Sequence, residues 1–380
     1  MTPKDLVEKL RAAGDLPPGL DVFLRRVPRA RFIPDQMWVS VDGEWRAIDR
    51  STDPELWEGY VYDDVVIATQ FDDGATLWPA IGKRPTCSAS QPSVVVGMLA
   101  ELDVQPGDIV LEIGTGTGFN AALLAELVGP RGRVISVEID QVLAATARSR
   151  LSRVGYGDPN VTVVWADGTL GDPYALPEAQ FDRVIATAAV QLGRLPRPWI
   201  QQSRPGAVMV VPMRTDFASG PLVRWEVGKD GTAEGRACPM GVGFMELRSH
   251  RVPMTEAEDD IQWDDPRASV SRTALNPRRI FDSPHSRFAV GVAMPGCQYG
   301  LEDPEPGEEE GLVWLRDTIS DSWACIARHG ETRVVRQYGP RSLWDDAERA
   351  YRWFLDQDRP SVLDYRFTVT PQRQSILLSS

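Results

Sequence analysis

The stretch Glu112–Gly118 reads EIGTGTG and stands between a short apolar run and a helical pattern. Glycines let the chain turn tightly and let a ligand approach the backbone. The amides that open a following helix favour a negatively charged group. The glycine spacing is GxGxG, whereas the dinucleotide fingerprint is GxGxxG, so the pattern argues against a nicotinamide dinucleotide. It predicts a loop that binds another charged ligand, with a plain strand-to-helix turn as the alternative.

Two acidic residues follow the glycine loop, each near the end of a strand-like run. Glu138 lies in RVISVEI (133–139), at the distance where a carboxylate accepts hydrogen bonds from ribose hydroxyls. Asp167 follows VTVVW (161–165), where a carboxylate can meet the exocyclic amine of adenine. The alternatives are a solvated carboxylate at a strand end and a turn-forming Asp-Gly pair. Together the three sites predict a pocket for an adenosine that bears a small charged tail.

Short β-rich runs alternate with helical patterns through residues 90–213. This order is typical of a parallel sheet covered by helices on both faces, and right-handed crossovers make such a sheet doubly wound. We therefore predict an α/β fold in which the three candidate sites share the carboxyl edge of one sheet. The expected helices are 92–102, 119–128, 141–153 and about 197–203, and the expected strands are 109–113, 133–139, 161–165, 181–189 and 207–213.

The rest of the chain divides into flanking units. We predict an N-terminal segment (1–80), a core (81–255) with further strands at 222–227 and 243–252, and a C-terminal α+β domain (256–380). The last unit has alternating strand-like runs, a helical pattern at 342–357 and an acidic loop at 301–310. It also contains five Trp residues, which are either core residues or part of a surface that recognises a peptide: Trp263, Trp314, Trp323, Trp344 and Trp353.

Composition excludes several classes of function. The 41 basic and 54 acidic residues give a net charge of −13, which argues against nucleic acid as the main partner. The four Cys form no CxxC pair, so neither a disulfide framework nor a zinc site is expected, and we predict no metal. All three His lie at residue 250 or beyond, which rules out a His-based triad within the first 249 residues. No run is long enough for a membrane span, and the charged start lacks the apolar core of a secretory signal, so we expect a cytoplasmic location.

Five segments together resemble the class I S-adenosylmethionine methyltransferases: VLEIGTGTGFNAALLAEL, VISVEID, WADGTLG, FDRVIATAA and RPGAVMVVP. Two further segments resemble the protein-L-isoaspartate O-methyltransferases within that superfamily. Arg31-Phe32-Ile33-Pro34 is similar to an early RFVP-like element of the family, and Ser88-Ala89-Ser90-Gln91-Pro92 is similar to its active-site loop. The resemblance spans about residues 20–215 and implies a Rossmann-like class I methyltransferase sheet with S-adenosyl-L-methionine as the methyl donor and S-adenosyl-L-homocysteine as the product.

The resemblance also implies roles for individual residues. Ser88 and Ser90 would face the acceptor carboxylate as the catalytic pair. The acceptor pocket would include Gln91, Thr187, Ala188 and Ala189. The cofactor would be held by Glu112, Gly114, Thr115, Gly116, Gly118, Asn120, Glu138, Ile139, Asp167 and Gly168. Three departures from the family pattern affect the acceptor side alone: Ser88 replaces the usual Thr, Ser93 replaces His or Tyr, and Val190-Gln191 replaces Ala-Pro.

Carboxylate methylation suits this set of residues. A carboxylate is already nucleophilic at neutral pH, so its methylation needs no general base, and the protein mainly has to bring the reactants together. The long chain and Arg-rich composition resemble a family branch found with ribosomally made peptides in actinobacteria, which methylates an Asp of a lanthipeptide or lasso peptide on the way to an aspartimide (succinimide). We expect such a peptide as acceptor. The alternatives are repair of L-isoaspartyl residues in proteins, methylation of a small metabolite, and non-catalytic nucleotide binding.

Overall fold

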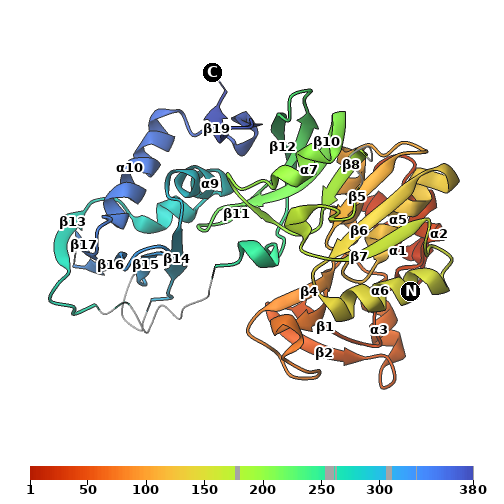
Figure 1. The fold of residues 1–380 in the computed structure, drawn as a ribbon. Coiled ribbons are helices and arrows are strands. Elements are labelled where there is room, and N and C mark those ends of the chain that lie inside the picture. The colour runs from red at the N-terminus through yellow and green to blue at the C-terminus, as the bar shows by residue number, and fades with distance from the viewer. Residues whose placement is uncertain (176–179, 253–260, 262, 305–309, 331, 380) are drawn as a thin grey trace.

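The computed structural model describes residues 1–380 except 176–179, 253–260, 262, 305–309, 331 and 380, and it contains three sheets (Figure 1). The central, largest sheet has the order β19-β18-β12-β11-β10-β8-β5-β6-β7. Its parallel part consists of β5 (Ile109–Ile113), β6 (Arg133–Glu138), β7 (Val161–Trp165), β8 (Phe181–Ala186) and β10 (Ser203–Arg214), with the short β9 (Val190–Gln191) beside β10. These five long strands are buried on both faces, which explains their nearly continuous apolar runs.

Helices cover both faces of the parallel strands, so the predicted doubly wound α/β fold is confirmed. One face packs against α4 (Pro92–Leu102), α5 (Phe119–Val128) and α6 (Gln141–Arg153), and the other against α7 (Arg197–Gln201). Farther along the same sheet, α9 (Pro284–Ala293) packs against the antiparallel strand β11 (Ser219–Val227). From β5 the chain winds outward through β6 to β7, then crosses back to place β8 on the other side of β5. This change of direction between β5 and β8 is where ligands bind in open sheets of this kind.

The N-terminal residues, drawn in red and orange, place a small antiparallel sheet below the central sheet and two helices beside it (Figure 1). The small sheet has the order β2-β1-β3-β4 and ends in the strand that carries Ser88. The elements are α1 (Pro3–Ala13), α2 (Asp21–Arg26), β1 (Gln36–Val41), β2 (Glu44–Asp49), α3 (Pro54–Val61), β3 (Ile67–Phe71) and β4 (Pro85–Ala89). Leu6, Val7 and Leu10 of α1 are buried, as their helical spacing predicts.

The C-terminal region contributes to two different sheets. A separate five-stranded antiparallel sheet, order β13-β17-β16-β15-β14, packs against α10 (Leu343–Asp356), with β13 (Ser269–Thr273), β14 (Cys297–Leu301), β15 (Val313–Asp317), β16 (Trp323–His329) and β17 (Thr332–Tyr338). The last strands, β18 (Tyr365–Val369) and β19 (Gln374–Leu378), instead extend the central sheet beside β12 (Ala233–Gly241). Part of the predicted unit 256–380 therefore completes the core, and the boundary at 255 stays a prediction.

One predicted strand is wrong. Residues 243–252 form irregular chain with one 3-10 turn at Arg248–His250. The strand predicted at 222–227 is present as β11 (Ser219–Val227), but its antiparallel partner β12 was not predicted. The reason is that Gly235 and Pro239 weaken the strand pattern of β12. Phe244, Met245 and Leu247 of segment 243–252 line a cavity.

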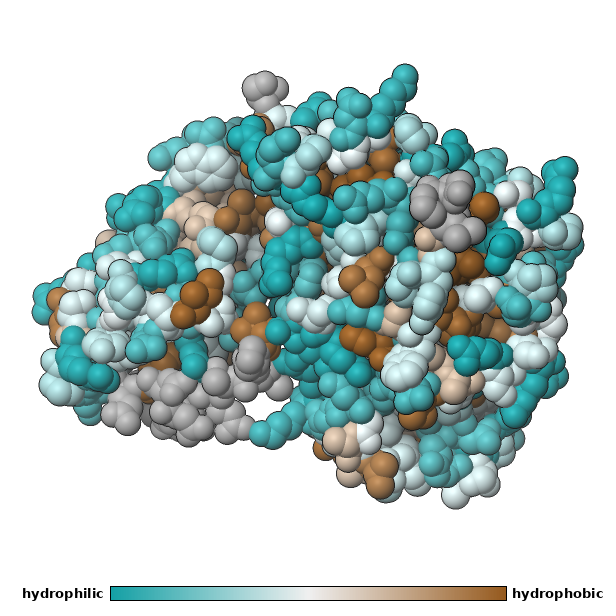
Figure 2. All heavy atoms as spheres, in the orientation of Figure 1, coloured by the Kyte–Doolittle hydropathy of each residue, from teal (hydrophilic) through white to brown (hydrophobic). Residues whose placement is uncertain are grey.

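The tryptophans of the C-terminal region divide between core and surface. Trp323 and Trp344 are buried, which confirms the core alternative for these two, while Trp263 and Trp353 are exposed. Residues 305–309, which are half of the acidic loop predicted at 301–310, lie outside the described residues. The face shown in Figure 2 is largely hydrophilic, with hydrophobic residues in small separate areas. Among the described residues, no helix has the length and apolar character needed to cross a bilayer.

Candidate active site

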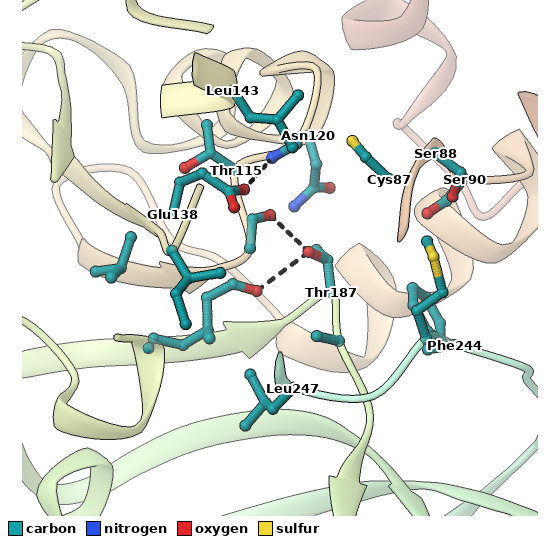
Figure 3. Close-up of a pocket in the computed structure, with 18 of the residues that line it drawn as sticks. Cys87, Ser88, Ser90, Thr115, Asn120, Glu138, Leu143, Thr187, Phe244 and Leu247 are labelled. Atoms are coloured by element: carbon teal, nitrogen blue, oxygen red, sulfur yellow. Dashed lines mark hydrogen bonds between the residues drawn. The ribbon is translucent and has the colours of Figure 1, made fainter. Parts of the chain in front are cut away.

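A cavity opens at the carboxyl ends of β5, β6, β7 and β8 and brings together most of the predicted site residues (Figure 3). Figure 3 shows Thr115, Glu138 and Leu143 on one side of it and Ser88 and Ser90 on the other. The predicted residues that line the cavity are Ser88, Ser90, Gly114, Thr115, Gly116, Asn120, Glu138, Ile139, Asp167, Gly168, Thr187 and Ala188. Segments far apart in the sequence therefore form one site with two distinct halves.

The glycine loop after β5 has the backbone that its sequence predicts. Gly114, Gly116 and Gly118 have φ values of +93°, +52° and +89°, a region that other residues rarely adopt. A Cβ on Gly114 would lie 2.5 Å from Oγ1 of Thr187, so the space there is also too small for a side chain. The Thr187 hydroxyl donates to the carbonyl of Gly114 at 2.6 Å, which holds this loop against the end of β8.

Glu112 supports this loop from beneath and does not line the cavity. Its side chain is completely buried and accepts hydrogen bonds from Asn120 Nδ2 at 2.7 Å and from the Ser136 hydroxyl. Ser136 in turn shares a hydrogen bond of 2.6 Å with Thr115 of the loop. Burial raises the pKa of Glu112 to about 7, although both hydrogen bonds favour the ionised form. Glu112 thus connects β5, β6 and α5 under the loop.

Glu138 and Asp167 lie on the half of the cavity that the sequence assigns to a nucleoside. The Glu138 carboxylate accepts from the amides of Gly116 at 2.9 Å and Asp140 at 3.0 Å, which fixes its position and leaves lone pairs for a diol. Its burial raises its pKa. Asp167 accepts from the Thr169 amide at 2.9 Å through one oxygen. Apolar side chains of Ile139, Leu143 and Leu247 complete this half, so the residues fit an adenosine group.

Ser88 and Ser90 form the opposite half of the cavity. Within the described part of the chain, neither hydroxyl makes a hydrogen bond to another residue, so both are available to a ligand. Cys87 lies beside them, and burial raises the pKa of its thiol to about 12, which keeps it protonated. A carboxylate on this side would meet two neutral hydroxyl donors, which can orient it without removing its charge.

Three other predicted residues lie outside the cavity lining. Gln91 donates to Oδ2 of Asp64 at 2.9 Å and anchors the serine loop, residues Ser88–Gln91. Ala189 forms backbone hydrogen bonds with Met245 and Leu247, and Gly118 begins helix α5. Their direct role in ligand binding stays a prediction.

The irregular segment 243–251 is the part of the site that sequence reasoning missed. Phe244, Leu247, Arg248 and Arg251 from this segment line the cavity, and Ala189 holds it in place by accepting from the Leu247 amide at 2.9 Å. The only sequence signal for this part of the site was the alternation of apolar residues, which we interpreted as a strand. Only the position of the segment over the sheet edge distinguishes the two interpretations.

An ion-pair network joins this segment to the N-terminal unit at the rim of the cavity. Asp73, in the turn after β3, accepts from Arg248 Nη2 at 2.9 Å and from Arg251 Nη1 at 2.8 Å. Arg248 also lies 3.4 Å from the carboxylate of Asp140, the residue that caps α6. The network therefore connects three separate segments around the nucleoside half. In the described ranges, no group of three or more His, Cys, Asp and Glu residues is arranged to hold a metal ion.

Comparisons with known proteins agree with this geometry. A family model described as protein-L-isoaspartate(D-aspartate) O-methyltransferase matches residues 41–251, more than half of the chain. Protein-L-isoaspartate O-methyltransferase 2 of Archaeoglobus fulgidus is 34% identical over 246 residues, which is 64% of this chain and 91% of the relative. A solved structure titled protein-L-isoaspartate O-methyltransferase superposes with a TM-score of 0.55 at 19% identity, covering 100% of both chains, and supports the fold.

Other relatives match over a shorter length. Protein-L-isoaspartate O-methyltransferase of Ignicoccus hospitalis is 43% identical over 136 residues, which is 36% of this chain and 60% of the relative. The corresponding protein of Methanopyrus kandleri is 45% identical, and the match spans 55% of its length. Residues 1–40 and 252–380 lie outside the range of the family model.

Proposed function

Because the chain belongs to the protein-L-isoaspartate(D-aspartate) O-methyltransferase family, we propose that it transfers a methyl group from S-adenosyl-L-methionine to the carboxylate of an aspartyl or isoaspartyl residue. The observation that carries this proposal is the single cavity with two chemically different halves. One half combines Glu138 and Asp167 with apolar walls, and the other presents the free hydroxyls of Ser88 and Ser90. The first suits an adenosine, and the second suits an anionic acceptor.

The chain's own residues define how the cofactor would be held. Glu138 would accept hydrogen bonds from the ribose hydroxyls, Ile139 and Leu247 would contact the adenine, and Asp167 would lie at the adenine edge, since all four residues line the cavity. The glycine loop lets the amino-acid tail approach the backbone at Gly114 and Gly116. When bound, the cofactor supplies an electrophilic methyl group on a sulfonium.

In the reaction, a carboxylate oxygen of the acceptor bonds to the methyl carbon, the carbon–sulfur bond breaks and its electron pair stays on sulfur. The products are a methyl ester and S-adenosyl-L-homocysteine. No proton is transferred, which agrees with hydroxyls rather than a base on the acceptor side. Ser88 and Ser90 donate hydrogen bonds that orient the carboxylate for in-line attack. A neighbouring backbone amide of the acceptor then attacks the ester, releases methanol and closes a succinimide.

Two acceptor classes have separate support. The names of the relatives support an L-isoaspartyl residue in a damaged protein. The resemblance of the long, Arg-rich chain to a peptide-modifying branch of the family supports a dedicated peptide such as a constrained ribosomally made peptide with an Asp side chain, and residues 252–380, outside the family model, would recognise it. We propose that the enzyme methylates L-isoaspartyl residues as its basic activity and that a dedicated Asp-containing peptide is its specialised substrate.

Mass spectrometry of two reactions tests the proposal. Purified protein and S-adenosyl-L-methionine are incubated with an isoaspartyl peptide and with a ring-constrained Asp peptide, each alongside the same peptide with Asn at that position. Methyl transfer adds one methylene to the peptide mass, and closure removes one water from the original mass. Retention of intact cofactor with no product from either peptide would instead support the non-catalytic binding alternative.

A further inference from the structure

Arg29 is a buried cation at the back of the serine loop. It lies in the short 3-10 helix Arg29–Arg31 with 1% of its surface exposed, although it carries a guanidinium group. Burial lowers its pKa to about 10, so the group stays charged at neutral pH. A buried charge is expensive unless its donors are satisfied, and an apolar side chain would fill the same space at lower cost. Its presence therefore requires a geometric reason.

The hydrogen bonds of Arg29 provide that reason, because all their acceptors are backbone carbonyls from two segments. Nη1 donates to Val61 at 3.1 Å and to Asp63 at 3.2 Å, on the turn between α3 and β3. Nη2 donates to Val65 at 3.0 Å on the same turn. The same nitrogen donates to Ala89 at 3.1 Å and Ser90 at 2.8 Å, on the serine loop. One planar group thus fixes the serine loop to the 61–65 turn.

Asp64, on the same turn, holds the other end of the serine loop. Its Oδ2 accepts from the Gln91 side chain at 2.9 Å, and its Oδ1 accepts from the Ser93 amide at 2.8 Å, in the first turn of α4. The turn therefore holds the serine loop from both ends, by its carbonyls through Arg29 and by the carboxylate of Asp64. Both supports act on the backbone or on Gln91 and leave the two serine hydroxyls untouched.

This arrangement matters because the serine hydroxyls have no partners of their own among the described residues. Their direction toward an acceptor depends on the backbone that carries them. We propose that Arg29 and Asp64 are positioning residues that hold the Ser88–Gln91 loop at the distance and angle needed for methyl transfer. The inference rests on the proposed function for its kinetic consequence, but the positioning itself has a physical readout that is independent of activity.

The test compares Arg29→Lys, Arg29→Met, Asp64→Asn and Asp64→Ala with Val27→Ala. Val27 is fully buried two residues before Arg29 and contributes only packing, so it controls for a general loss of stability. Hydrogen exchange of the amides in 86–93 is measured by mass spectrometry, with kcat for the isoaspartyl peptide and the Kd of S-adenosyl-L-homocysteine.

We expect faster exchange at 86–93 and a kcat lower by about 100-fold in Arg29→Met, since a misplacement near 1 Å costs about that much. Arg29→Lys, with one donor nitrogen, falls between Arg29→Met and the wild type, and Asp64→Asn retains more activity than Asp64→Ala. The Kd changes by no more than about threefold, because the supports do not reach the nucleoside half.

The inference would be overturned if the folded Arg29 and Asp64 variants showed the same hydrogen exchange at 86–93 and the same kcat as Val27→Ala. If Arg29→Met does not fold, Arg29→Lys and the Asp64 variants decide the question. If the wild type methylates neither peptide, the proposed function fails while the exchange measurement still decides whether these residues position the loop.

Discussion

Replacing Glu112 by Gln changes one buried group without changing its shape. The carbonyl oxygen of Gln can accept from Asn120 as Oε1 of Glu112 does. Its amide nitrogen would donate to Ser136, whose hydroxyl would then donate to Thr115, because either of those two hydroxyls can be the donor. The network is thus satisfied with two hydrogen bonds reversed and with no charge in the interior.

The structure gives the size of the expected effect. Burial raises the pKa of Glu112 to about 7 from the model-compound value of 4.5. The folded protein therefore holds a proton in the window where the unfolded chain has lost it, so this group's contribution to stability is complete below pH 4.5 and is lost as the pH rises through 7. At about 1.4 kcal/mol per pH unit, the loss across the window is roughly 3 kcal/mol. Gln has no such loss.

Urea unfolding of the wild type and Glu112→Gln from about pH 5 to about pH 8 measures the effect. The difference between their free energies of unfolding should shift in favour of the variant by roughly 3 kcal/mol as the pH rises, while every other titrating group cancels. A difference that stays constant over this range would show that Glu112 is ionised throughout and would refute the reasoning.

Further predictions concern the cavity. Gly116→Val should abolish binding of S-adenosyl-L-homocysteine, because φ is +52° there and the methyl groups would enter the cavity, and calorimetric titration with unchanged affinity would contradict it. Glu138→Ala should weaken the same binding by about 1.5–3 kcal/mol, the size of a hydrogen bond to a charged group. Ser90→Ala should lower kcat and kcat/KM together by about 10- to 100-fold at nearly unchanged cofactor affinity, and normal turnover would place the acceptor elsewhere. Asp73→Asn should speed cofactor release a few-fold by weakening the ion pair with Arg251, and stopped-flow measurements of the release rate test this. A release rate that equals that of the wild type and does not depend on salt would exclude a role for this ion pair.

The meeting of the glycine loop, Glu138 and Asp167 at one cavity could be predicted because each signal is local in the sequence. The glycine loop, Glu138 and Asp167 each follow a strand of a parallel sheet, and the topology of such a sheet brings strand ends together. The pattern of buried strands and amphipathic helices was enough to locate them. Glu112 was predicted at the cavity and lies beneath it, since a sequence motif does not distinguish a ligand from its support.

The remaining parts could not be predicted because they depend on long-range packing. Segment 243–251 has a strand-like pattern and lines a cavity. Arg29 looks like an ordinary surface cation in the sequence, yet it is buried by contacts with residues 32 to 61 positions away. The addition of β18 to the central sheet has no local signal either, because its strand pattern does not specify a partner.

The position of β18 has a consequence for how the chain is made. β12 ends at Gly241 and its neighbour begins at Tyr365, so a ribosome must synthesise residues 242–364 before the two can pair. During that interval β12 is an open edge, on which unpaired backbone groups can recruit another nascent chain. Glu234 and Arg236 are exposed on this strand, and charged side chains at an edge oppose such pairing. A chain cut near residue 255 would keep that open edge permanently, so aggregation is an expected outcome of truncation even when the cofactor loop itself is intact.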